Sequence, residues 1–250
     1  MGIWTDILDL LLPRRCIMCG HRLSAHEKFI CNGCLIHIPY TNYHTLQHSP
    51  LEKQFWGRFP IEKAVSMFHH DGEKTRHLIY HIKYWNHPQL GTYLASIYAK
   101  TLMESHFFDD IDAIIPLPLH GRRQLKRHYN QSHYIAEGIR QVTGLPVLHH
   151  VVKRTKNNPA QALLHAQERM ENVKGIFLLT HPEKIQGKHI LLIDDVTTTG
   201  ATIASCAEEL AKAPDVKISV LTLSIAGRTA LPASDEDRID VSVFGVPLME

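Results

Sequence analysis

The sequence predicts an α/β protein in which helices flank a mostly parallel sheet, with a small four-cysteine unit near the N-terminus. Two observations support this fold class. Apolar runs typical of strands alternate with segments of helical periodicity, and strands joined through helices form parallel sheets by right-handed crossovers. Near the N-terminus, two Cys-x-x-Cys pairs are separated by eleven residues.

The composition is that of a globular protein. Of 250 residues, 44% are hydrophobic and 21% are charged, which argues against a largely disordered chain, a collagen-like repeat and a coiled-coil rod. The formal net charge of +2 gives no sign of a dedicated nucleic-acid binder. Five cysteines are too few for a disulfide-stapled secreted scaffold, so the paired cysteines indicate metal binding in a reducing compartment.

The first residues predict a short helix. Apolar residues between Ile3 and Leu11 follow helical spacing, and Pro13 would end the helix. No basic residue precedes this run, and it is shorter than the roughly 20 apolar residues that a membrane span needs. We therefore expect no signal peptide and no transmembrane segment, and we place the protein in the cytoplasm.

Four parts are expected along the chain. They are the N-terminal helix and cysteine unit (1–45), a connector and hood-like region (46–105), the main α/β core (106–228) and a C-terminal tail (229–250). A composition break after the cysteines spans the boundary between the first two parts: Ile38–Pro60 is rich in Tyr, His and Thr and has no clear periodicity, which indicates a connector or covering segment.

Hydrophobic periodicity places the elements from residue 64 onward. Short apolar runs predict strands, and apolar residues at helical spacing predict helices. The expected strands are 64–68, 112–117, 145–148, 189–193 and 216–225. The expected helices are 75–84, 90–103, 131–142 and 201–213.

The cysteine pairs predict a structural zinc site. Cys16 and Cys19 form one pair, and Cys31 and Cys34 form the other. Two tight turns, each presenting two thiolates, make a closed tetrahedral site of four sulfurs that suits Zn²⁺, as in a zinc ribbon. A redox-active dithiol and free thiols are the alternatives, because the spacer is shorter than usual. The fifth cysteine, Cys206, is expected to be an inert buried thiol.

The most informative segment is residues 190–202. Four aliphatic residues form a predicted buried strand, the acids Asp194 and Asp195 follow it, and a turn rich in threonine and glycine opens the next helix. In open α/β sheets ligands bind at this end of the strands. Backbone N–H groups at the start of a helix can hold a phosphate, and two adjacent carboxylates can accept hydrogen bonds from vicinal hydroxyls. The pattern therefore predicts a ribose 5-phosphate site; the alternative is an acidic strand end that caps a helix and binds no ligand.

This segment resembles the phosphoribosyl pyrophosphate signature of the type I phosphoribosyltransferases. The resemblance implies that Asp194 and Asp195 bind the ribose hydroxyls and that the loop from Thr198 to Thr202 holds the 5-phosphate, with Mg²⁺ bound together with the substrate. Two positions depart from the pattern, since Thr197 replaces a usual aliphatic residue and Thr198 stands where the purine-using branch has a catalytic aspartate. The residues expected to bind this ligand are Asp194, Asp195, Val196, Thr197, Thr198, Thr199, Gly200, Ala201 and Thr202.

The small net charge conceals a basic segment. Residues 113–158 have a net charge of +7, so the remaining 204 residues sum to −5. Positive charge after the first deep strand has an anionic target, either pyrophosphate or a DNA backbone. The candidate residues are His120, Arg122, Arg123, Lys126, Arg127 and Arg154. Tyr129, Tyr84 and Trp85 could stack bases between such charges, or they could be ordinary core and surface residues.

A wider set of motifs is similar to one family. Pro-Leu-Pro-Leu-His before Arg122, then Tyr129-Asn130-Gln131, Arg154-Thr155 and Gly175-Ile176-Phe177, occur in an order that resembles the ComF competence proteins, which include GntX-like proteins. The resemblance implies a zinc ribbon joined to a type I phosphoribosyltransferase domain, binding of phosphoribosyl pyrophosphate with Mg²⁺, and binding of single-stranded DNA together with DNA-uptake machinery during natural transformation. It names no phosphoribosyl acceptor. The alternatives are an active transferase of nucleotide or base metabolism and a non-catalytic adaptor held together by zinc.

Overall fold

The computed structural model describes residues 13–70, 72–85, 87–120, 128–155 and 175–227. The helices are α2 (Asn32–Ile36), α3 (Pro50–Lys53), α4 (Glu73–Tyr84), α5 (Pro88–Glu104), α7 (Gln131–Thr143) and α9 (Ala201–Leu210), with 3-10 turns at η1 (Tyr43–Thr45) and η2 (Pro182–Lys184). The strands are β1 (Ile61–His69), β2 (Ala113–Pro116), β3 (Val152–Arg154), β4 (Phe177–Leu179), β5 (His189–Thr197) and β6 (Lys217–Ile225).

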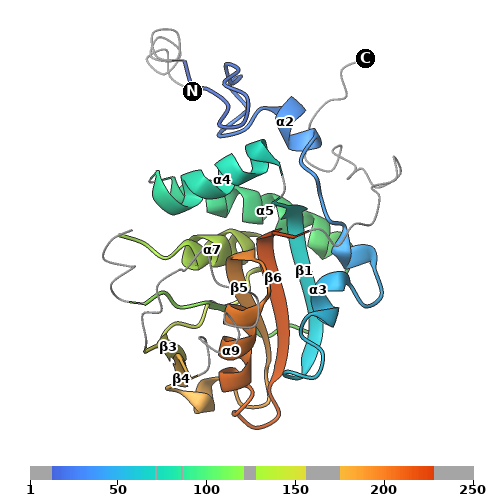
Figure 1. Cartoon of the computed structure of the whole chain (residues 1–250), viewed down its shortest axis with the longest axis vertical. Coiled ribbons are helices and arrows are strands. Elements are labelled where there is room, and N and C mark those ends of the chain that lie inside the picture. The colour runs from blue at the N-terminus through green and yellow to red at the C-terminus, as the bar shows by residue number, and fades with distance from the viewer. Residues whose placement is uncertain (1–12, 71, 86, 121–127, 156–174, 228–250) are drawn as a thin grey trace.

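Four of these strands form the central sheet. Their order is β1-β6-β5-β2, and every pair is parallel, while β3 and β4 form a separate antiparallel pair (Figure 1). Pro116, the last residue of β2, pairs with Ile193 of β5, so the carboxyl ends of these two strands meet at one edge of the sheet. The predicted α/β class with a parallel sheet is confirmed.

Strand β5 is buried on both faces of the sheet. Its successive side chains point alternately into the two layers that cover the sheet. Leu191 and Ile193 pack in the layer formed with α4, α5 and α7, whereas Ile190 and Leu192 pack in the layer formed with α9 and the β3–β4 pair. All four side chains are fully buried. This burial explains why the strand reads as a continuous aliphatic run.

The predicted elements agree with the structure except at the sheet edge. Residues 145–148 run beside β2 but form only the single bridge Ile114 to Val147, because Pro146 has no N–H to donate. The short strands β3 and β4 were not predicted, since three residues are too few for a period to be recognised. Strand β5 extends four residues beyond the predicted end, because it stays paired with β6 as far as Thr197.

The aperiodic segment that contains Ile38–Pro60 packs into the core. Ser49 caps α3 and its hydroxyl donates to the carbonyl of Ala64 in β1 at 2.8 Å, while the Glu52 N–H donates to the Ser49 hydroxyl at 3.1 Å. Leu51 and Phe55 are fully buried. The segment is therefore a layer against the sheet, held by single anchoring residues instead of a periodic face.

Some expectations fall outside the described residues. The predicted helix between Ile3 and Leu11 and the C-terminal tail lie there. Within the described ranges, none of the helices is long and apolar enough to cross a membrane. The division at residues 45, 105 and 228 stays a prediction.

Candidate functional site

The four paired cysteines lie together. The Sγ atoms of Cys16, Cys19, Cys31 and Cys34 are all within 4.8 Å of one another, and the Sγ atoms of Cys19 and Cys31 are 3.7 Å apart. A disulfide would need about 2.05 Å, whereas Zn–S bonds of about 2.3 Å in a tetrahedron separate the sulfurs by about 3.8 Å. The sulfur positions therefore fit a tetrahedral zinc ion.

Local hydrogen bonds prepare these sulfurs as ligands. A hydrogen bond from the backbone N–H of His21 lowers the pKa of the Cys19 thiol to about 7. Burial instead raises the pKa of Cys31 and of Cys34, and their neighbouring thiols raise the pKa of Cys34 further. These raised pKa values favour protonated thiols in the absence of a metal, whereas a bound cation would stabilise the thiolates.

Two different backbone turns present the cysteines. In the first pair Gly20 adopts φ +73°, and its N–H donates to the carbonyl of Cys16 at 2.8 Å. In the second pair Cys31 is the N-cap of α2, and its Sγ accepts from the N–H of Cys34 at 3.4 Å. The unit packs on the main body through Phe29, whose ring lies 5.7 Å from that of Tyr93 in α5.

The second group of interest is the acid pair at the carboxyl end of β5. Ser132, in the first turn of α7, donates its hydroxyl to Asp194 Oδ1 at 3.2 Å, and the backbone N–H of Asp195 donates to the same oxygen at 2.9 Å. Asn130 holds this helix end in place, since it caps α7 and donates its side-chain amide to the Leu117 carbonyl at 3.0 Å. The end of β2, the start of α7 and the acid pair thus form one connected unit.

Lys83 completes the site and was missed from the sequence as a site residue. Its ammonium lies 3.2 Å from Asp195 Oδ1, and the exposed fractions of the two side chains are 22% and 11%. Only the packing of α4 beside the sheet shows that this lysine reaches the acid pair.

The two carboxylates have different electrostatic surroundings. Burial, and then the charge of Asp195, raise the pKa of Asp194 to about 7, against the lowering effect of the Asp195 N–H, Lys83 and Ser132. Asp195 has the direct ion pair with Lys83. At neutral pH the pair is therefore ready to accept hydrogen bonds, with Asp194 close to its point of protonation.

The predicted phosphate loop follows the acids directly. Gly200 adopts φ +66° and begins α9, so the first N–H groups of α9 have no intrahelical acceptor and point out of the helix start. Phe55 lies so close that a Cβ on Gly200 would be 2.6 Å from its Cε1, and Gln54 donates to the Thr198 carbonyl at 3.3 Å. The covering segment therefore packs against the back of this loop.

The threonines of the loop differ in exposure. Thr197 is 2% exposed and packs in the sheet, as expected for a β-branched residue at that position. Thr198 is exposed, and Thr199 and Thr202 are partly exposed. Three hydroxyls are thus near the helix start and accessible from solvent.

The structure describes part of the basic segment. His120 lies just beyond β2 and is partly exposed, and Arg154 ends β3 with its guanidinium 5.6 Å from the ring centroid of Phe177. Arg122, Arg123, Lys126 and Arg127 lie outside the described residues. Whether these six side chains act together stays a prediction.

The three aromatic residues considered for base stacking separate into two kinds. Tyr84 and Trp85 are 55% and 54% exposed, and neighbouring Tyr80 has its ring 4.8 Å from that of Tyr84. Tyr129 instead is buried, and its hydroxyl donates to the Ile82 carbonyl at 2.7 Å. The expectation that Tyr129 joins an exposed stacking surface is therefore not met. Cys206 is fully buried and burial raises its pKa, as expected for an inert thiol.

Comparison with known proteins finds competence and DNA-utilization proteins that are similar to this chain. No family model matches the chain. Competence protein F of Haemophilus influenzae is 28% identical over 224 residues, which cover 85% of this chain and 97% of that protein. The DNA utilization protein YhgH of Escherichia coli is 26% identical over 198 residues, covering 78% and 83% of the two chains. Competence protein ComFC of Bacillus subtilis is 32% identical over 133 residues, covering 52% of this chain and half of that protein.

Solved structures show weaker similarity. The UMP synthase of Leishmania donovani gives a TM-score of 0.33 with 15% identity, covering 59% of this chain and 24% of that one. The HGPRT-ase of Leishmania tarentolae in complex with GMP gives 0.28 with 13% identity, covering 57% and 80%. At these TM-scores neither structure bears on function. Two of these relatives are matched along most of their length, and the predicted motifs agree with them: the chain is similar to the ComF/YhgH family of competence and DNA-utilization proteins.

Proposed function

We propose that the protein binds phosphoribosyl pyrophosphate with Mg²⁺ at the carboxyl end of β5 and acts in DNA uptake or utilization through single-stranded DNA. The observation that carries the first part is the position of Asp194 and Asp195 directly before the start of α9. Carboxylates that can accept hydrogen bonds from a ribose diol therefore lie beside N–H groups that can donate to a phosphate, at the sheet edge where α/β proteins bind ligands.

Each part of the ligand has a matching group in the chain. The carboxylates of Asp194 and Asp195 accept hydrogen bonds from the two ribose hydroxyls. The N–H groups and hydroxyls from Thr198 to Thr202 hold the 5-phosphate, which the positive end of the α9 dipole also favours. Mg²⁺ takes oxygen ligands and is usually held partly by substrate phosphates, so it would bind with the pyrophosphate.

Lys83 prepares this site in the absence of ligand. Its ammonium neutralises Asp195, which has an 11% exposed side chain and would otherwise be a poorly solvated charge beside a second carboxylate. A ribose that donates to Asp195 competes with this ion pair, and the released ammonium then faces an anionic ligand. Lys83 is thus a positioning residue that balances the charge of the acid pair.

Titration calorimetry with phosphoribosyl pyrophosphate and Mg²⁺ tests the ligand. We expect Asp195→Asn to weaken binding roughly ten- to a hundredfold, the value of one or two charge-assisted hydrogen bonds. Asp109→Asn is the matched control, because Asp109 is an exposed acid paired only locally with His106 at 3.0 Å. Equal binding by both variants, or no heat with the wild type, would refute the proposal.

Two further measurements test the alternatives, an active phosphoribosyltransferase and a non-catalytic adaptor held together by zinc. Release of pyrophosphate in the presence of a nucleobase would favour an active phosphoribosyltransferase. The exposed Thr198, where the purine-using branch has an aspartate, gives no support to a general acid in this loop. Absence of ligand binding, together with loss of structure on zinc chelation, would favour the adaptor. Zinc in either case is structural, because four cysteines leave it no open position.

The DNA part of the proposal is supported by exposed aromatic rings near the acid pair. Tyr80, Tyr84 and Trp85 lie at the end of α4, the helix that also carries Lys83, and aromatic rings beside cations bind single strands by stacking. The names of the relatives add a DNA-utilization context, and we place this activity in the cytoplasm.

A matched tryptophan pair tests DNA binding. Trp85 and Trp56 are 54% and 52% exposed, but Trp56 belongs to the covering segment, where its ring lies beside that of His48, and not to the end of α4. We expect Trp85→Ala to weaken binding of an oligothymidylate by roughly tenfold, as for the loss of one stacked base, and Trp56→Ala to leave it unchanged. Binding that is equal in both variants and insensitive to salt would refute this part.

A further inference from the structure

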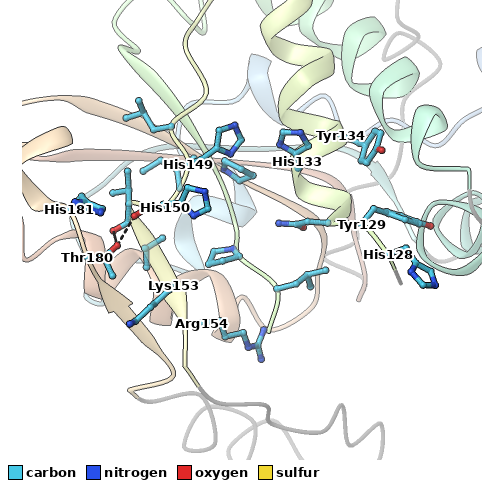
Figure 2. Close-up of a pocket in the computed structure, with 18 residues that line it drawn as sticks. His128, Tyr129, His133, Tyr134, His149, His150, Lys153, Arg154, Thr180 and His181 are labelled. Atoms are coloured by element: carbon cyan, nitrogen blue, oxygen red, sulfur yellow. Dashed lines mark hydrogen bonds between the residues drawn. The ribbon is translucent and has the colours of Figure 1, made fainter. Parts of the chain in front are cut away.

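A pocket of about 680 Å³ lies between α7 and the β3–β4 pair (Figure 2). Its volume is within the range of small-molecule sites. It is bordered by the end of β2 through Ile115 and Pro116, and by the start of α7 through residues 128–134. It shares no lining residue with the acid pair or with the loop from Thr198 to Thr202.

The walls of this pocket are fixed by hydrogen bonds. On one side, the Leu148 N–H donates to the Ile114 carbonyl at 2.8 Å, which ties the segment before β3 to β2. On the other side, the Thr180 hydroxyl lies 2.6 Å from the His150 carbonyl and 2.9 Å from the Val151 carbonyl. The pocket is therefore formed before a ligand binds.

The lining is basic. Among the described residues that line it there is no aspartate or glutamate. In the view of Figure 2, Lys153 and Arg154 lie toward one end of the pocket and His133 and His149 toward the other. The groups that are positively charged or can become so are His128, His133, His149, His150, Lys153, Arg154 and His181.

The imidazole end combines aromatic surface with titratable groups. The rings of His133 and His149 are 5.0 Å apart, and those of His149 and His150 are 6.3 Å apart. Burial, and then the proximity of His133 and His150, lower the pKa of His149. An anion in the pocket would reverse part of this effect by favouring the protonated rings.

Nearby acids are already paired. On α7, Glu137 is held by Arg140 at 2.6 and 2.7 Å, and beyond β4, Glu183 lies 3.0 Å from His181. Protonated His181 is therefore matched by Glu183, and Glu137 lies near enough to His133 to interact with its charge. Around His149 and His150, by contrast, no aspartate or glutamate is among the described lining residues. Acidification would raise the positive charge of the pocket.

Much of the remaining lining is apolar. It includes Ile115, Pro116, Leu148, Val151 and Val152. A pocket with apolar surface and imidazole rings at one end and fixed cations at the other fits a planar heterocycle that carries a phosphate. We propose that it binds a 5′-mononucleotide, with the phosphate at Lys153 and Arg154 and the base against His133 and His149.

This ligand could be a free nucleotide or the terminal residue of a single strand, because both present the same chemistry. The site differs from that proposed for phosphoribosyl pyrophosphate because none of its described lining residues comes from β5 or α9, although Arg154 is a candidate for both. Binding here thus goes beyond the proposed function and can fail independently of it.

Nuclear magnetic resonance of the zinc-loaded full chain tests the proposal through the imidazole Cε1–H signals. Adenosine 5′-monophosphate, adenosine and inorganic phosphate are the probes, and His133→Gln and His149→Gln assign the two signals. Both side chains are exposed, so the variants are expected to fold. We expect the nucleotide to shift both signals and to bind roughly tenfold more tightly than either fragment, because it contacts both ends of the pocket.

Variants and pH locate the two ends. Lys153→Ala should weaken nucleotide binding roughly tenfold without affecting adenosine, and His106→Gln, at an exposed histidine outside the pocket, should have no effect. Because the pKa of His149 is lowered, this ring stays neutral above a pH of about 7, so affinity for the nucleotide should change little between a pH of about 8 and about 7. Asp195→Asn should leave these signals and affinities unchanged, while the three pocket variants should keep wild-type binding of phosphoribosyl pyrophosphate.

Several outcomes would overturn the proposal. They are the absence of binding at millimolar nucleotide, signal shifts confined to other histidines, and loss of nucleotide binding on Asp195→Asn but not on Lys153→Ala. A single strand with a 5′-phosphate that shifts the same two signals more strongly than the mononucleotide supports the strand end as the source. Shifts by the mononucleotide alone support the free nucleotide.

Discussion

Replacing Gly200 by alanine tests how the covering segment shapes the phosphate loop. The new Cβ would lie 2.6 Å from Phe55 Cε1 and 3.1 Å from its Cζ, and the ring cannot move away because Phe55 is fully buried. Such overpacking costs about 1–3 kcal/mol. The left-handed backbone, with φ +66°, adds about 1 kcal/mol for any residue with a Cβ. We therefore expect the free energy of unfolding to fall by about 2–4 kcal/mol.

Gly144→Ala is the matched control for the backbone contribution. Gly144 has φ +75° at the end of α7, and a Cβ there would meet no atom within 4 Å. The two variants bear the same kind of backbone cost, so their difference in urea denaturation measures the contact with Phe55, about 1–3 kcal/mol. The double variant Gly200→Ala with Phe55→Leu should lose less stability than the two single changes added together. Equal destabilisation by Gly200→Ala and Gly144→Ala would refute the reasoning.

Three further predictions concern the charged and metal-binding groups. Chelation of zinc, or Cys34→Ser, should release one metal per chain to a colorimetric indicator and lower the melting temperature; no metal in the purified protein would contradict the zinc assignment. Lys83→Met should destabilise the fold by about 1–3 kcal/mol in urea denaturation, because Asp195 keeps its charge without a cation, and adding Asp195→Asn should restore part of the loss. The pKa of Asp194 is about 7 in the folded protein and about 4 in the unfolded chain. Its contribution to the free energy of unfolding is therefore fully present below a pH of about 4 and is lost as the pH rises through about 7. Asp194→Asn should remove that loss, so its urea midpoint relative to wild type should be higher at pH of about 8 than at about 5; an unchanged difference would contradict the raised pKa.

The periodicity of apolar residues was sufficient to predict the central strands and helices. Strand β5 could be predicted because a strand buried on both faces must be continuously apolar, and α5 and α7 because their buried residues repeat at helical spacing. The covering segment could not be predicted in this way. Phe55 and Ser49 each anchor it by one specific contact, and single contacts between distant residues leave no period in a sequence.

The candidate site shows the same division. Spacing alone brought together the four cysteines, because Cys-x-x-Cys turns fix two sulfurs locally and only two such turns had to meet. The acid pair and the loop before α9 were also predictable, since they are consecutive in the chain. Lys83 and Ser132 were not, because they reach Asp195 and Asp194 from helices that are 112 and 62 residues away in sequence.

The sequence by itself determined the parallel α/β class, the cysteine cluster, the order of acids and threonines at the end of β5, and the resemblance to the ComF proteins. Each of these depends on neighbouring residues or on a repeated pattern. Only the tertiary structure decided which cation faces the acid pair, that Tyr129 is buried, and that five histidines line a pocket without acids among its described lining residues. These features arise where separate elements pack together, and the energy of such packing depends on distances in space that sequence separation does not encode.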